Sequence, residues 1–114
     1  MTDNPAFDKS RPFPVAAFVT VKEGEEQAFL SLLQEIAAYL AEAAPDKTYV
    51  YSWARDTENP RLFTLYEVHA NWEAAMWHRQ DAALVDFGKR FAPLVESTRQ
   101  STGTWVAGSE SSRY

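Results

Sequence analysis

The chain has 114 residues, of which 46% are hydrophobic and 24% are charged, a composition typical of one soluble globular domain. It contains no cysteine, which excludes disulfide bonds and thiolate metal sites. The net charge is −5 and the 11 basic residues are scattered, so we expect no nucleic-acid partner. No apolar run approaches the roughly 20 residues that span a bilayer, so we expect no membrane association and a cytoplasmic location.

The first part of the chain predicts a strand followed by a long helix. Residues 1–12 are polar, carry prolines and have no hydrophobic period, which indicates a flexible N-terminal arm. Phe13–Val21 alternates as a strand, with mostly apolar side chains on both of its faces. After a turn around Gly24, hydrophobic residues recur at helical spacing until about Ala43, namely Phe29, Leu32, Leu33, Ile36 and Leu40.

The second part predicts a hairpin, further helix and a last strand. Lys47–Arg55 and Leu62–His69 are typical strands, joined by a turn rich in Asp, Asn and Pro. Asn71 is a suitable cap for a helix that begins at the next residue. The hydrophobic period of Leu84–Val95 again predicts a helix, and we expect a short fourth strand around Trp105.

The predicted order β-α-β-β-α-β is that of the ferredoxin-like fold of the α+β class, in which helices cover one face of a four-stranded antiparallel sheet. Residues 13–107 would form this single domain, and residues 108–114 a polar tail. The other face of the sheet should be polar if it met water, but the strands offer apolar and aromatic side chains on both faces. We therefore expect a homodimer that buries this open sheet face.

Four stretches of the chain resemble, in their order and spacing, one known family. They read FVTVKEGEEQAFLSLL, YSWARDTENPRLFTLYEV, NWEAAMWHR and FGKRFAPLV, and the likeness extends over about residues 13–97. With these segments the chain is similar to the antibiotic biosynthesis monooxygenase domains of the dimeric α+β barrel superfamily. Tyr51, Phe63, Tyr66 and Glu67 stand at matching places, and His78 stands where the family usually has a histidine.

The chain departs from this family around the expected pocket. The family's third strand usually ends in a tryptophan, whereas this chain has His69 there. The segment after the family histidine commonly reads Ser-Pro-His-Phe, whereas this chain has Asp81, Ala82, Ala83 and Leu84 and so lacks a second family histidine. Because these differences lie where a substrate would bind, the family's substrates do not transfer to this chain with the fold.

The resemblance implies a cofactor-free monooxygenase that oxidises a small electron-rich aromatic, such as a quinol or an anthrone-like polyketide, with molecular oxygen. Such a reaction needs a base that titrates near neutral pH and donors for the developing oxyanion. We expect His78 to be that base, because an unperturbed imidazole titrates near about 6.5. The candidate substrate-binding residues are aromatic and histidine side chains: Tyr51, Trp53, Phe63, Tyr66, His69, Trp72 and Trp77.

We expect neither an organic cofactor nor a metal. With only four glycines in the chain, no phosphate-cradling loop can be written, so flavin or nicotinamide binding by such a loop is unsupported. A metal site would have to combine His69 and His78 with carboxylates, and their spacing matches no familiar ligand pattern. Glu67 shares a strand face with His69 by alternation, and we expect it to form a structural ion pair.

The sequence leaves three points open. If one unbroken helix runs from Trp72 to Val95, His78 faces solvent, and it reaches a pocket only if the helix breaks near Asp81. His69 is either a second acid–base group or a hydrogen-bonded residue that fills the space of the family's tryptophan. The protein is alternatively a non-catalytic dimer that binds a small molecule or a haem-binding relative, although it lacks the strand-one asparagine and strand-three tryptophan of the haem branch.

Overall fold

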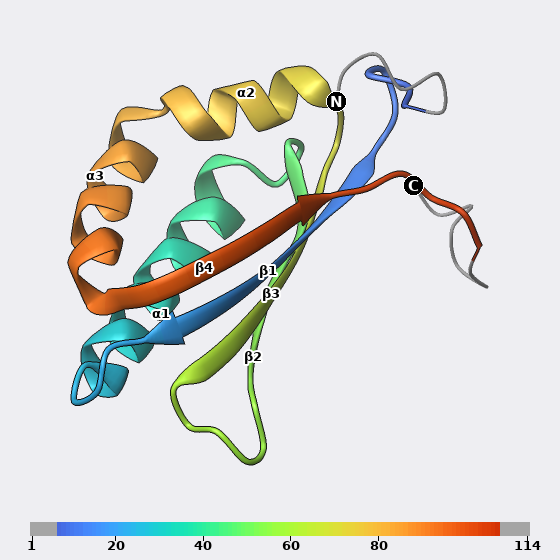
Figure 1. The fold of residues 1–114 in the computed structure, drawn as a ribbon. Helices are drawn as coiled ribbons and strands as arrows, with labels where there is room; N and C mark the ends of the chain where they lie inside the picture. Colours follow the sequence, from blue (N-terminus) through green and yellow to red (C-terminus); the bar gives the residue numbers. More distant parts are fainter. Residues whose placement is uncertain (1–6, 108–114) are drawn as a thin grey trace.

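The computed structural model describes residues 7–107, and Figure 1 shows how their elements are arranged. The regular elements are β1 (Phe13–Val21), α1 (Glu26–Ala43), β2 (Thr48–Arg55), β3 (Leu62–His69), α2 (Trp72–Gln80), α3 (Ala82–Phe91), the short 3-10 helix η1 (Ala92–Leu94) and β4 (Val95–Thr102). Residues 1–6 of the predicted arm and the whole predicted tail, residues 108–114, lie outside the described residues.

The four strands form one antiparallel sheet in the order β2-β3-β1-β4, and the helices lie on one side of it (Figure 1). This arrangement confirms the predicted ferredoxin-like α+β fold. The chain turns from β1 into α1 at Gly24, whose φ of 86° lies in the left-handed region that favours glycine. No helix within residues 7–107 is both long enough and apolar enough to cross a bilayer.

The main core lies between α1 and the inner face of the sheet. The buried residues of α1 are those that the helical period predicts: Phe29, Leu32, Leu33, Ile36 and Leu40. The ring of Phe29 is fully buried and lies 4.9 Å from that of Phe63 and 5.2 Å from that of Phe91, centroid to centroid. This aromatic cluster joins α1, β3 and α3, so it holds two of the helices on the sheet.

The outer face of the sheet, which points away from the helices, is partly aromatic. Phe18 of β1 is 51% exposed and Tyr66 of β3 is 40% exposed, and each alternates with inward-facing buried neighbours. Tyr49 of β2 is exposed as well. It lies between Thr48 and Val50, where the pairing of β2 with β3 shifts its register. The described residues therefore leave an aromatic surface in contact with solvent.

The fourth strand is not where the sequence predicts it, and this prediction is wrong. The structure places β4 at Val95–Thr102, paired antiparallel with β1, rather than around Trp105. The last helical segment ends before Val95, because Pro93 lies in the 3-10 turn that follows α3. Trp105 follows the strand, and its indole N–H donates a hydrogen bond of 2.9 Å to the carbonyl oxygen of Pro12.

We predict that Phe29→Ala lowers the free energy of unfolding by about 3–5 kcal/mol, because it leaves a cavity within the aromatic cluster. Urea denaturation followed by circular dichroism measures this loss. Val85→Ala is the control, since Val85 lies on α3 and is 41% exposed, and we expect it to change stability by less than about 1 kcal/mol. Equal effects of the two substitutions would contradict the placement of the core.

Candidate active site

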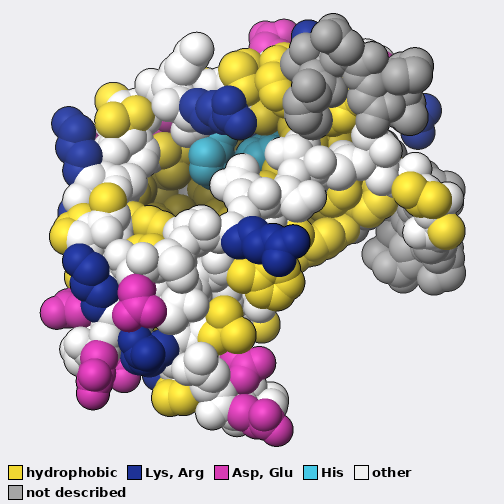
Figure 2. All heavy atoms as spheres, in the orientation of Figure 1, with side chains coloured by type: hydrophobic (Ala, Val, Ile, Leu, Met, Phe, Trp, Pro, Cys, Tyr) yellow, Lys and Arg dark blue, Asp and Glu magenta, His cyan; other side chains and the backbone are white. Residues whose placement is uncertain are grey.

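A cavity of about 280 Å³ opens between the inner face of the sheet and the helices. In Figure 2 it is a hollow with the histidine side chains beside it. Its floor is the apolar inner face of β1, with Phe13, Val15, Ala17 and Val19. The polar side chains along it from β4 are Thr98, Gln100 and Thr102, and the helices contribute Ile36, Leu84, Phe87 and Phe91 among others.

The structure brings five of the eight predicted site residues to this cavity: Tyr51, Trp53, His69, Trp72 and His78. Three others lie elsewhere. Phe63 is buried in the core against Phe29, and Tyr66 lies on the outer face of the sheet. Trp77 packs against the apolar side chains of α1 with the ammonium of Lys47 5.3 Å from its ring centroid.

A break between α2 and α3 turns His78 toward the cavity. Asp81, between the two helices, has an extended backbone (φ −60°, ψ 129°), and its carboxylate accepts a hydrogen bond of 3.2 Å from the amide of Leu84 as the cap of α3. The same carboxylate accepts a bond of 2.7 Å from the Tyr39 hydroxyl of α1. In one unbroken helix, His78 and Leu84 would point about 120° apart. The break lets both line one cavity.

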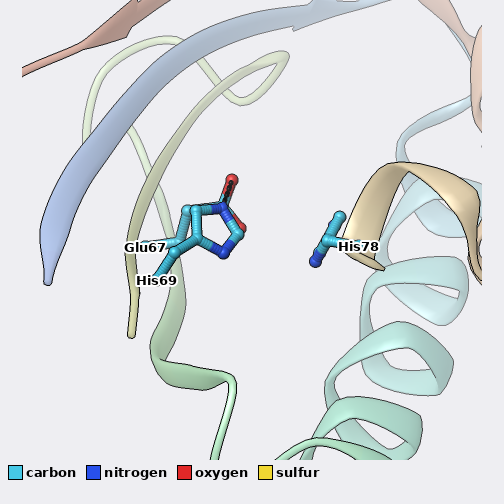
Figure 3. Close-up of side chains that lie close together, drawn as sticks. All are labelled: Glu67, His69 and His78. Atoms are coloured by element: carbon cyan, nitrogen blue, oxygen red, sulfur yellow. Dashed lines mark ion pairs between the residues drawn. The ribbon is translucent and has the colours of Figure 1, made fainter. Parts of the chain in front are cut away.

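Glu67, His69 and His78 form a compact group at the cavity (Figure 3). Glu67 and His69 alternate on the inner face of β3, and the His69 Nε2 atom lies 3.6 Å from Oε1 of Glu67. The rings of His69 and His78 lie 5.3 Å apart, centroid to centroid, in an edge-to-face arrangement. The predicted pairing of Glu67 with a neighbouring group is thus with a histidine of the site itself.

Much of the polar surface of this group is removed from water. Glu67 is 7% exposed and His69 is 4% exposed. Glu67 Oε2 and the Nδ1 atoms of both histidines are buried and have no hydrogen-bond partner among residues 7–107. Buried polar atoms of this kind are rare because each costs about 1–3 kcal/mol, and they occur where a ligand or a reaction uses them.

Burial is the main cause that lowers the pKa of His78 below its ordinary value. The carboxylate of Glu67 opposes this by favouring the charged imidazolium, and His69 adds to the lowering. The charge of Asp81 raises the same pKa and that of Arg79 lowers it, both with smaller effects. His78 is therefore a neutral imidazole at neutral pH, and a neutral imidazole can accept a proton.

Tyr51 keeps its proton under the same conditions. Burial raises the pKa of its phenol well above the ordinary value, and the nearby charge of Glu67 raises it further. Its hydroxyl is thus a hydrogen-bond donor at the cavity, next to the indole of Trp53 at a ring-centroid distance of 6.3 Å. The cavity holds a neutral base, a phenol donor and flat aromatic walls.

Comparison with known proteins gives the family of this chain. The model of the antibiotic biosynthesis monooxygenase family matches residues 12–90, which is more than half of the chain. The chain belongs to this family. A comparison with curated protein sequences gives no significant match.

Solved structures show the same fold at low sequence identity. PA3566 from Pseudomonas aeruginosa has a TM-score of 0.76 at 19% identity, over 89% of this chain and 100% of that one. SO0527 from Shewanella oneidensis has a TM-score of 0.73 at 22% identity, over 82% and 90% of the two chains. SnoaB, a cofactor-independent oxygenase from Streptomyces nogalater, has a TM-score of 0.77 at 13% identity, over 87% and 97%.

The sequence did not predict every residue that lines the cavity. Thr98, Gln100 and Thr102 reach it from β4, a strand that the sequence places too late in the chain. These three residues are spaced two apart, as side chains on one face of a strand are. The strand was hard to recognise because no apolar residue alternates with them. Arg79, next to His78 on α2, also lines the cavity. Glu67 was recognised only as a member of an ion pair, whereas the structure places it in the cavity wall.

We predict that Asp81→Ala lowers the free energy of unfolding by about 0.5–2 kcal/mol, because it removes the cap of α3. Asp81→Asn is the matched control, since an asparagine caps nearly as well. Urea denaturation of the two variants measures the difference. An alanine variant as stable as the asparagine variant would show that the Asp81 carboxylate does not hold the break.

We also predict that His78 titrates below about 6.5, because its charged form loses hydration in the cavity wall. Its ring protons in the NMR spectrum of EDTA-treated protein report the midpoint, and the spectrum of His78→Gln assigns them. A lowered midpoint means that the neutral form persists to more acidic pH than in an unfolded chain. A midpoint above that of a free imidazole would contradict the buried position.

Proposed function

We propose that this protein is a cofactor-independent monooxygenase that oxidises a small electron-rich aromatic, a quinol or an anthrone-like polyketide, with molecular oxygen. The observation that carries the proposal is the half-buried, neutral imidazole of His78 beside an aromatic-lined cavity. Membership of the antibiotic biosynthesis monooxygenase family supports it, as does the fold shared with SnoaB, which is described as a cofactor-independent oxygenase.

The chemistry is balanced without an added reductant. His78 takes a proton from the activated position of the substrate and leaves a carbanion or phenolate. This anion gives one electron to oxygen, and the resulting radical pair joins in a carbon–oxygen bond as a peroxide anion, which takes the proton back from His78 and becomes a hydroperoxide. For a substrate with a ring methylene, loss of water from the hydroperoxide leaves a ketone. One oxygen atom enters the product, the other becomes water, and oxygen accepts four electrons from the methylene carbon.

Several cavity residues have a role in this scheme. The Tyr51 hydroxyl donates a hydrogen bond to the oxyanion that develops when the proton leaves. Trp53 and Trp72 provide flat walls for a ring system. Glu67 lies next to His69, whose ring neighbours that of His78, and we assign His69 the role of receiving the proton from His78. Phe63, Tyr66 and Trp77, which lie away from the cavity, take no part.

We further infer that two copies of the chain associate through the outer face of the sheet. Phe18 and Tyr66 leave an exposed aromatic surface there, and a second copy would remove it from water. A symmetric pair is the commonest way in which a protein covers such a face. The cavity lies on the other side of the sheet, so each copy keeps its own site.

We predict that metal-free protein consumes oxygen in the presence of at least one member of a panel of quinols, dihydroxynaphthalenes and anthrones. His78→Gln should lower the rate by about two to four orders of magnitude, because the general base is lost. Glu73→Gln, at an exposed position of the same helix, is the control and should keep the wild-type rate. An oxygen electrode follows the reaction.

The outcomes of that experiment separate the alternatives. A rate that survives His78→Gln would remove His78 as the base and keep the enzyme. No uptake with any member of the panel would contradict the oxygenase proposal. Binding of the same compounds, followed by tryptophan fluorescence, would in that case favour a module that binds a small molecule without turnover.

We predict that Phe18→Glu converts a dimer into a monomer, because it places a charge in the apolar contact between copies. The new carboxylate would face Arg99, the partner of Phe18 across β1 and β4, so the fold of the single copy should persist. Val85→Glu introduces the same charge at a similarly exposed position on α3 and should leave the mass unchanged. Light scattering after size exclusion gives the mass, and a monomeric wild type would overturn the inference.

A further inference from the structure

We propose that Glu67, His69 and His78 also form a binding site for one divalent first-row transition-metal ion. The proposal goes beyond the monooxygenase reaction, which uses no metal. Each of the three residues offers one ligand atom, and these atoms all lie within 4.8 Å of one another (Figure 3). Two imidazoles and one carboxylate are a donor set that zinc and iron(II) sites share.

The spacing of the ligand atoms is close to that of a loaded site. Ligand atoms about 2.0–2.2 Å from a tetrahedral zinc ion lie about 3.3–3.6 Å from one another. Nε2 of His69 and Oε1 of Glu67 are already 3.6 Å apart. The remaining pairs lie within 4.8 Å, so they need to close by roughly 1 Å to reach the spacing of a loaded site.

The elements that carry the ligands are held firmly. Glu67 and His69 lie on β3, which is paired with β1 on one side and β2 on the other. His78 lies in the last turn of α2, whose end is fixed by the break at Asp81 and by the hydrogen bond from Tyr39. A site on such elements binds a metal without first ordering a loop, so less of the binding free energy is lost.

The burial of these groups also favours a cation. Glu67 is 7% exposed, and within residues 7–107 no lysine or arginine lies within ion-pair distance of its carboxylate. Its Oε2 and the Nδ1 atoms of His69 and His78 lack hydrogen-bond partners among the described residues. A divalent ion bound by this group would compensate the buried carboxylate of Glu67.

The donor set also indicates which ions fit. Two nitrogen ligands and one carboxylate suit Zn²⁺, Co²⁺ or Fe²⁺ better than Mg²⁺ or Ca²⁺, which prefer oxygen ligands. One carboxylate and two neutral imidazoles leave the loaded site with a net charge of +1. Three protein ligands also leave at least one coordination position open, and the cavity lies beside it.

The metal-bound state and the base-active state exclude each other. An ion on His78 would occupy a lone pair of the imidazole on which the proposed proton transfer depends. We therefore expect Zn²⁺ to inhibit oxygen uptake, and chelation to restore it. Binding itself does not depend on that reaction, so the site can be tested even if no substrate is found.

The first test is a titration of Co²⁺ into EDTA-treated, dialysed, tag-free protein, followed by visible absorption. We expect one ion per chain, with the intense absorption of a four- or five-coordinate site. Calorimetry with Zn²⁺ should give the same stoichiometry. Glu67→Gln, His69→Gln and His78→Gln should each weaken Zn²⁺ binding by at least about 10-fold, whereas Glu73→Gln should not. Circular dichroism confirms that each variant is folded.

A second measurement needs no variant. Bound Co²⁺ is paramagnetic, so it should shift or broaden the ring signals of both histidines in the NMR spectrum of the wild-type protein at one equivalent. Unaffected histidine signals, or Zn²⁺ binding that persists unchanged in the three glutamine variants, would overturn the proposal. If Co²⁺ binding depends on Glu67, His69 and His78 but no oxygen is consumed, the result would contradict the monooxygenase function and leave the metal site standing.

Discussion

The bond between Tyr39 and Asp81 determines which way His78 faces, and the rest of the site depends on it. Asp81 ends α2 with its extended backbone, and its carboxylate caps α3 and accepts a hydrogen bond from α1, so one residue connects three helices. A proline at this position would end the helix by its missing N–H. Here a capping carboxylate and a distant tyrosine produce the break without a proline.

One side chain, His78, takes part in both properties proposed for the site. Removal of water from His78 lowers its pKa and leaves a neutral imidazole with an available lone pair. That lone pair can take a proton from a substrate or bind a metal ion. Glu67 affects both outcomes, because its buried negative charge favours a proton and a cation alike. The two activities therefore compete for one nitrogen atom.

The sequence predicted the parts of the fold whose side chains are buried on one face. The stripe of α1 and the alternation of β1 and β3 are of this kind, and the structure confirms them. β4 was misplaced because its side chains are mostly polar and exposed, so no hydrophobic period marks it. Its place follows from the long-range pairing with β1, which no local pattern contains.

The candidate site was predictable only in part, for a related reason. Alternation along β3 places Glu67 and His69 on one face, as expected, and Tyr66 on the other. It does not tell whether an inward side chain meets the core, as Phe63 does, or the cavity. Likewise, the period of a helix says nothing about a break that depends on Tyr39, 42 residues earlier in the chain.

The two long walls of the cavity differ in how freely they can change. Val15 and Val19 on β1 belong to buried apolar clusters, so any substitution that reshapes this wall also disturbs the packing. Thr98 and Gln100 on β4 face the same cavity but are exposed and contribute little to the core. Variation along the β4 side could thus adapt the protein to differently shaped molecules while leaving its stability almost untouched.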